Sequence, residues 1–203
     1  MGSRPRTPSS LPLALAGAAW MLAVLGGMST LWDHANRPGR SAHPPSHWPE
    51  QSRIERSPGR ATLVMLVHPQ CPCSRASVGE LAALMAHAQG RLSAHVLFVE
   101  PPGLSDDWTG TDLWESAGAI PGVETVRDRD GVEARHFDAA TSGQVVLYDT
   151  GGALRFSGGI TAARGHSGDN GGRDAILALL AGSPSPSDEA PVFGCALFDT
   201  GPS

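Results

Sequence analysis

Several residue types are absent or scarce in this sequence, and each absence narrows what the chain can do. There is no lysine, so all 15 basic residues are arginines, which excludes Schiff-base chemistry and a P-loop lysine. The formal net charge is −5, which argues against a general nucleic-acid binder, because such a protein needs a basic face that releases counterions. The three cysteines are too few for a disulfide scaffold but enough for one reactive pair and a third thiol.

The charge is unevenly distributed along the chain. Residues 1–60 carry seven arginines and three acidic residues, a net charge of +4, whereas residues 61–203 carry eight arginines and 17 acidic residues, a net charge of −9. We therefore expect the two parts of the chain to lie in different settings.

An apolar stretch follows a short N-terminal segment, residues 1–10. Residues 11–32 (LPLALAGAAWMLAVLGGMSTLW) contain no charge, and as a helix they span roughly 30 Å, the thickness of the hydrocarbon core of a membrane. We predict one N-terminal transmembrane helix; a cleaved signal and a buried core helix remain alternatives. Because long domains translocate largely regardless of charge, we expect a membrane-anchored protein with its C-terminal domain on the periplasmic, extracytoplasmic side.

Residues 33–60 contain five prolines and almost no apolar periodicity. This composition predicts a flexible Pro-rich tether. A globular domain is expected over residues 61–182, followed by a Ser/Pro-rich C-terminal tail, residues 183–203, that carries Cys195.

Within the globular domain, apolar periodicity alternates with turn residues. Strands are predicted at 61–68, 92–100, 123–127, 144–149 and 153–157, and helices at 74–89, 111–119, 131–137 and 173–181. Two strands linked through a helix, closed by a hairpin and a last helix, indicate an α/β fold with a mixed sheet and helices on both faces.

The most specific motif is the run His68-Pro-Gln-Cys71-Pro-Cys73-Ser74, which lies between a buried strand and the start of a helix. A thiol at this position faces the positive end of the helix dipole and free backbone N–H groups, which favour thiolate over thiol. Because the thiolate is the nucleophile in disulfide exchange, the motif predicts a reactive cysteine.

The strand, this motif and the final hairpin resemble the thioredoxin-like family, in which the first strand leads into a Cys-x-x-Cys site on the following helix. The apolar N-terminal stretch and the central insert look like membrane-tethered members of the TlpA/ResA type, and the Pro-Cys-x-x-Ser run resembles the RedB group. The resemblance covers residues 61–182 and implies a thioredoxin-like mixed sheet. It places Cys71 at the attacking position and Ser74 at the resolving position.

The sequence departs from that family in two places. Gly143 stands where the family usually has a cis-proline, and Ser74 stands where it has the resolving cysteine. Cys73 is one candidate for the resolving thiol, although it would close a small, strained ring. Cys195 is the other, because the 13 residues after the last predicted helix can span roughly 40 Å when extended.

The resemblance also implies that the loop of residues 158–172 lies beside Cys71. In this loop His166 is a candidate catalytic residue, as a general acid, and either it or Arg164 could lower the pKa of a thiol. Asp169 and Asn170 are expected to stabilise the loop or cap the last helix.

The leading hypothesis is a membrane-tethered thiol–disulfide oxidoreductase without a cofactor. Cys71 would be the nucleophile, Cys73 or Cys195 the resolving thiol, and a protein dithiol or disulfide the substrate; no nucleic-acid partner is expected. One alternative is a Cu(I)-binding or copper-delivery protein that uses Cys71 and Cys73, with His166, His68 or Cys195 as a third ligand, since thiolates and imidazole are ligands for copper. Another is a thiol peroxidase in which Cys71 is oxidised to sulfenic acid.

Overall fold

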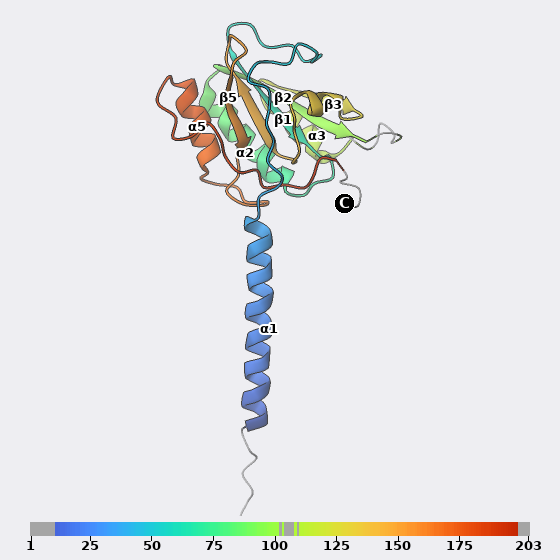
Figure 1. Cartoon of the computed structure of the whole chain (residues 1–203), viewed down its shortest axis with the longest axis vertical. Coiled ribbons are helices and arrows are strands. Elements are labelled where there is room, and N and C mark those ends of the chain that lie inside the picture. The colour runs from blue at the N-terminus through green and yellow to red at the C-terminus, as the bar shows by residue number, and fades with distance from the viewer. Residues whose placement is uncertain (1–10, 102, 104–107, 109, 199–203) are drawn as a thin grey trace, which may run out of the picture. The chain divides into compact units, whose positions relative to one another are not determined.

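The computed structural model describes residues 11–101, 103, 108 and 110–198, and the chain divides into two compact units at the junction of Asn36 and Arg37. The predicted N-terminal segment, residues 1–10, lies outside the described residues. In chain order the helices and strands are α1 (Leu11–Asn36), β1 (Ala61–Val67), α2 (Ser74–Ala88), β2 (Leu92–Glu100), α3 (Asp112–Gly118), β3 (Val123–Arg129), α4 (Val132–His136), β4 (Gln144–Tyr148), β5 (Leu154–Gly159) and α5 (Gly171–Leu180) (Figure 1).

The first unit consists of α1, which has 26 residues and no buried residue. It is long and apolar enough to cross a membrane, and its most apolar window has a mean hydropathy of 1.8. A signal sequence close to the N-terminus has the same properties. The helix continues past the predicted end at Trp32, where the side-chain Nδ2 of Asn36 donates a hydrogen bond to the Trp32 carbonyl (2.8 Å).

The second unit contains one five-stranded sheet with the order β3-β2-β1-β4-β5. β1, β2 and β3 are parallel, whereas β4 runs antiparallel to β1, and β5 runs antiparallel to β4. The central strand β1 has six buried residues out of seven, which explains its nearly continuous apolar sequence. The predicted mixed sheet of thioredoxin-like type is confirmed.

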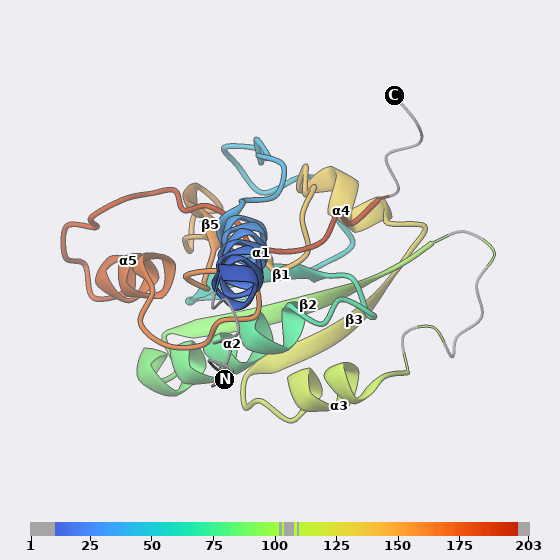
Figure 2. The same cartoon turned by 90° about the horizontal axis from the view of Figure 1, so that it is seen from below.

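Two apolar clusters lie on opposite faces of the sheet. Leu63 and Met65 of β1 pack toward the cluster that contains residues of α2, α3 and α5. Val64 and Leu66 belong to the other cluster, which includes residues of α4. Figure 2 shows α2 and α3 on one side of the sheet and α4 on the other, so helices cover both faces, as predicted.

Residues 37–57 differ from the flexible tether that their composition predicts, because they lie along the domain. Trp48 makes edge contacts with the rings of Phe137 and Tyr148, with both centroid distances 5.2 Å, and Ile54 is 8% exposed. The short helix α4 covers only part of its face of the sheet, and these apolar side chains cover more of it. We call residues 37–57 the N-terminal strap.

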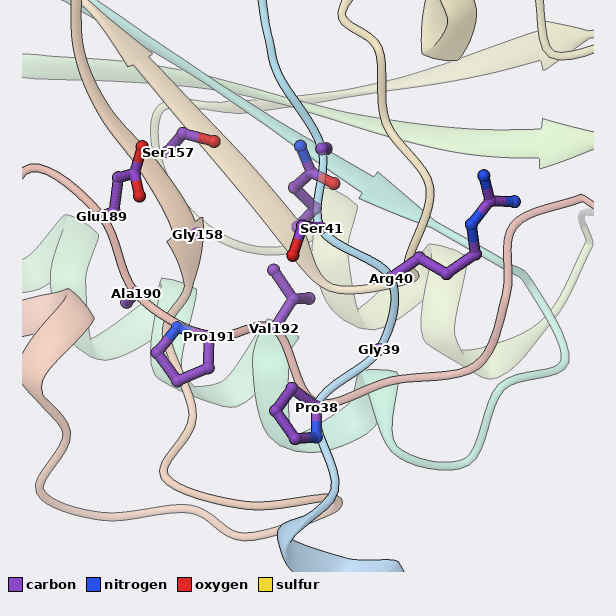
Figure 3. A pocket seen from close by; sticks show the side chains of 12 residues that line it. Pro38, Gly39, Arg40, Ser41, Ser157, Gly158, Glu189, Ala190, Pro191 and Val192 are labelled. Atoms are coloured by element: carbon purple, nitrogen blue, oxygen red, sulfur yellow. The ribbon is translucent and has the colours of Figure 1, made fainter.

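The end of the chain also returns to the domain. Within the C-terminal tail predicted over residues 183–203, residues 188–198 lie on the domain, and we call these residues the tail. They pair with β5, where the Ser157 N–H donates to the Asp188 carbonyl (2.9 Å). Figure 3 shows residues 38–41 of the strap, Ser157 and Gly158 of β5, and residues 189–192 of the tail around one cavity of about 200 Å³. The strap and the tail therefore meet beside β5.

Candidate active site

Three sulfur atoms gather at the C-terminal end of β1. The Sγ atoms of Cys71, Cys73 and Cys195 all lie within 4.8 Å of one another. The shortest separation joins Cys71 and Cys195, whose Sγ atoms are 3.0 Å apart across 124 positions of sequence. The structure thus brings together all three cysteines that the sequence proposed for the site.

The turn between β1 and α2 positions the first two cysteines. The Cys71 N–H donates to the His68 carbonyl (3.0 Å), and the Cys71 carbonyl accepts from the Ser74 N–H (3.1 Å). Cys73 is the N-cap residue of the 15-residue helix α2, and its side chain makes no capping hydrogen bond. Cys71 therefore lies at the positive end of a helix dipole, and it is only 3% exposed.

Backbone hydrogen bonds hold the tail against the segment that precedes β4. The Ser142 N–H donates to the Cys195 carbonyl (2.8 Å), and the Leu197 N–H donates to the Ala140 carbonyl (3.0 Å). A Cβ atom on Gly194 would lie 1.9 Å from the Ser142 carbonyl oxygen, so only glycine fits directly before Cys195. This pairing places the Cys195 thiol beside Cys71.

Arg164, in the loop after β5, adds a further contact to the tail. Its guanidinium donates to the Gly194 carbonyl. It also acts on the pKa values of Cys73 and Cys195 by favouring their ionised forms. Arg164 thus has two roles: it holds the tail through Gly194, and its positive charge favours ionisation of the neighbouring thiols.

The three thiols have different pKa values. Burial opposes ionisation of Cys71, but hydrogen bonds from Ser74 and Cys195 outweigh it and lower the pKa of Cys71 to about 7. Burial, together with the proton that Cys195 shares with Cys71 and the repulsion from that thiolate, raises the pKa of Cys195 to about 12. Burial and repulsion from Cys71 also raise the pKa of Cys73. Cys71 is therefore the thiol that ionises first.

A chain of hydroxyl groups leads to Cys71. The His68 N–H donates to the Ser142 Oγ (2.7 Å), which lies 2.8 Å from the Ser74 Oγ. When the Ser142 hydroxyl donates to the Ser74 Oγ, the Ser74 proton is left to bond the Cys71 thiolate. The role of Ser142 was not predicted from the sequence. The available signal was Ser74 at the resolving position, because a hydroxyl that bonds a thiolate needs a neighbouring donor to orient it.

The remaining candidates of the loop after β5 are not members of the cluster of sulfurs. His166 is exposed, and its backbone N–H donates to the Ala163 carbonyl (3.2 Å). The group of side chains that is close enough to share a metal ion contains Cys195 with Cys71 and Cys73, and does not include His166. Asn170 caps α5 by accepting from the Arg173 N–H (2.8 Å), which is the structural role expected for it.

A buried carboxylate fixes the position of this loop. Glu80 on α2 is 4% exposed and accepts from the Gly168 N–H (2.7 Å) and the Asn170 Nδ2 (3.2 Å). The Arg173 guanidinium approaches the same carboxylate at 2.5 Å. The C-terminal end of the loop, which leads into α5, is therefore held against α2.

Gly143, at the position of the family's cis-proline, has a backbone that proline cannot adopt. Its φ is +89°, and its N–H donates to the Leu66 carbonyl (2.8 Å), whereas proline has a fixed negative φ and no N–H. None of the described residues forms a cis peptide bond. The glycine that stands in place of the cis-proline is thus required by the backbone directly before β4.

Among known proteins, only solved structures match this chain. No protein-family model matches the sequence, and no curated protein matches it. An uncharacterized conserved protein from Geobacillus kaustophilus is 21% identical with a TM-score of 0.59, and the match covers 83% of this chain and 95% of that one. A hypothetical protein from Sinorhizobium meliloti is 22% identical with a TM-score of 0.57, over 70% of this chain and 82% of that one.

A more distant match is StoA from Bacillus subtilis, at 13% identity and a TM-score of 0.42, over 58% of this chain and 89% of that one. The two nearer matches establish a likeness in fold. The order of the five strands and their directions identify that fold. The chain has the thioredoxin-like fold.

Proposed function

We propose that this chain is a thiol–disulfide oxidoreductase in which Cys71 and Cys195 form the redox pair. The observation that carries the proposal is the separation of 3.0 Å between their Sγ atoms, which is about 1 Å longer than a disulfide bond. A small movement of the tail is enough to close the bond.

The electrostatics of the pair suit thiol exchange. The Cys71 thiolate, with a pKa of about 7, attacks one sulfur of a disulfide and forms a mixed disulfide, and the departing sulfur takes the electron pair. The negative charge on Cys71 is then gone, so its repulsion no longer adds to the burial that raises the pKa of Cys195. Cys195, favoured as thiolate by Arg164, then attacks Cys71 and completes the exchange.

In this proposal Cys73 is the remaining thiol. It lies within the same group of sulfurs, but its pKa is raised, and a bond to Cys71 would close a strained three-residue ring. His166 is exposed and is not a member of the sulfur cluster, and it has no part in the exchange proposed here.

We further propose that α1 tethers the domain to a membrane and that the domain acts on the extracytoplasmic side, on a protein dithiol or disulfide. The length and apolarity of α1 support the tether. A disulfide-forming pair suits the oxidising side of the membrane, where disulfides form and persist.

The test is disulfide mapping and turnover of the full chain in detergent. Mass spectrometry of the oxidised protein is expected to find a Cys71–Cys195 link, and a model disulfide should be reduced at a rate that falls at least 100-fold in Cys71→Ser. Cys73→Ser is the matched control and should keep most of the activity. A Cys71–Cys73 link, or exchange that survives Cys71→Ser, would contradict the proposal.

A second candidate function, Cu(I) binding, is favoured by the same group of three sulfurs within 4.8 Å. Soft thiolates select Cu(I), so Cys71, Cys73 and Cys195 would hold the ion. Titration of the reduced full chain with Cu(I) against a competing chelator is expected to show one ion per chain, lost in Cys195→Ala and kept in His166→Ala. If the chain takes up no Cu(I) from a chelator that is only strong enough to withdraw the ion from ordinary thiols, this candidate function is removed.

A further inference from the structure

The two cysteine residues of the redox pair differ in their exposure to solvent. Cys71 is 3% exposed, whereas Cys195 is exposed. The tail residue that carries Cys195 also covers Cys71, because their Sγ atoms lie 3.0 Å apart. A large partner therefore meets Cys195 first.

The cover over Cys71 is firmly attached. Phe193 and Leu197, on the two sides of Cys195, are 9% and 3% exposed, and Leu197 belongs to the apolar cluster on one face of the sheet. Between them, the Cys195 carbonyl accepts from the Ser142 N–H, and the Gly194 carbonyl accepts from Arg164. Exposing Cys71 would require all of these contacts to break.

The tail also occupies the backbone edge beside the reactive thiol. The segment of residues 140–142 already pairs with the tail through the two backbone hydrogen bonds at Ala140 and Ser142. An external peptide strand cannot use the same N–H and carbonyl groups while the tail is in place. Access through this edge is therefore closed as well.

From this geometry, and resting on the proposed function, we propose that a partner protein's thiolate attacks the Sγ of Cys195 in the oxidised pair and expels Cys71 as the leaving group. The partner is a protein dithiol, and the mixed disulfide forms on the tail rather than on the helix. Cys195 thus contacts the partner protein, and the buried Cys71 serves as the leaving group.

The step balances as follows. The partner sulfur forms a bond to the Cys195 sulfur, the Cys71–Cys195 bond breaks, and Cys71 takes the electron pair as a thiolate. The partner's second thiol loses its proton and attacks the partner's first sulfur, which releases Cys195 with the electron pair and a proton. The partner leaves oxidised to a disulfide, and the Cys71–Cys195 pair is reduced by two electrons.

The chemistry of the leaving group agrees with this direction. Exchange is faster when the departing thiol has the lower pKa. When Cys71 departs, the Ser74 hydroxyl remains in place to bond its thiolate, whereas burial opposes the departure of Cys195 as a thiolate. Attack at Cys195 therefore expels the better leaving group. Access and leaving-group chemistry favour the same sulfur.

The experiment traps the first mixed disulfide. The full chain carrying Cys73→Ser, in detergent, is oxidised to the Cys71–Cys195 disulfide and mixed with a cysteine-containing peptide that has one thiol. The reaction is stopped with acid within milliseconds to seconds, free thiols are alkylated, and mass spectrometry locates the peptide. We expect the adduct on Cys195 in at least tenfold excess over Cys71, with Cys71 alkylated.

Each outcome has a distinct meaning. An adduct mainly on Cys71 overturns this inference while leaving the redox pair intact, whereas failure to form the Cys71–Cys195 disulfide at all overturns the proposed function and the inference with it. Leu197→Ser, which loosens the tail, is expected to raise the share of adduct on Cys71 several-fold. An unchanged share in a folded Leu197→Ser protein shows that the tail does not control access, and also counts against the inference.

Discussion

Ser74→Ala is the most direct test of why Cys71 ionises easily. The substitution removes the hydroxyl that bonds the Cys71 thiolate and ends the chain of hydrogen bonds from His68 through Ser142. It leaves the helix in place, because alanine is a good helix former. The expected effect is a higher pKa of Cys71, without loss of the fold.

The size of the effect follows from the type of hydrogen bond. A hydrogen bond to a charged group contributes about 1.5–3 kcal/mol, and one pKa unit corresponds to about 1.4 kcal/mol. The pKa of Cys71 should therefore rise by about 1–2 units from its value of about 7. At pH 7 the ionised fraction would fall from about one half to about 1–10%.

The assay is the ultraviolet absorbance of thiolate at 240 nm as a function of pH, recorded on the reduced full chain. Because the pKa values of Cys73 and Cys195 are raised, the first thiolate to appear on raising the pH is Cys71. Ser77→Ala is the matched control, since Ser77 is a buried serine of the same helix, 2% exposed. A Cys71 pKa in Ser74→Ala that stays within about 0.3 units of that in Ser77→Ala would refute the role of the hydroxyl chain.

Three further variants probe the thiol pair, the buried carboxylate and the strap. Cys195→Ala should raise the pKa of Cys71 by about one unit, because it removes a thiol that donates to the thiolate; the same absorbance titration measures it, and no change would count against the pairing. Glu80→Gln should cost about 2–4 kcal/mol of stability in thermal or denaturant unfolding, since it leaves a largely buried guanidinium without its charge partner, whereas Asp169→Asn, whose side chain is fully exposed, should leave the melting temperature nearly unchanged. Trp48→Ala should cost about 2 kcal/mol and increase hydrogen exchange in the strap, because half-buried aromatic contacts are lost; unchanged exchange would show that the strap is held without Trp48.

Local sequence patterns were sufficient to predict the sheet. The apolar run of β1 and the alternation of strand and helix after it predicted the observed elements closely, and β2 has the same bounds as predicted. These elements bury their own apolar faces, so their periodicity is visible in the sequence. The cysteine motif was equally visible because it follows directly after a buried strand.

The strap and the tail could not be predicted in the same way. Both are rich in proline, serine and glycine, which indicates an irregular backbone but does not say whether that backbone is docked. What holds them is a few separate contacts: Trp48 against two rings, Leu197 in a cluster on the sheet, and Gly194 fitted under the Ser142 carbonyl. Isolated anchors of this kind leave no period in the sequence, although Cys195 gave a reason to expect that the tail returns.

The proposed resolving cysteine, Cys195, lies in the tail rather than at position 74, and this changes how strongly folding stabilises the disulfide. A disulfide that spans 124 positions restricts the unfolded chain far more than one between neighbouring turns, by about 5 kcal/mol against about 2 kcal/mol. Folding therefore favours the oxidised pair by about 3 kcal/mol more than in a Cys-x-x-Cys site. The lowered pKa of Cys71 acts in the opposite direction, but a thiol with a pKa of about 7 is only half ionised at pH 7, so it favours the reduced pair by about 0.4 kcal/mol. The chain-entropy contribution is therefore the larger of the two, provided that the contacts of Leu197 and Arg164 hold the tail beside Cys71 in the folded, reduced protein.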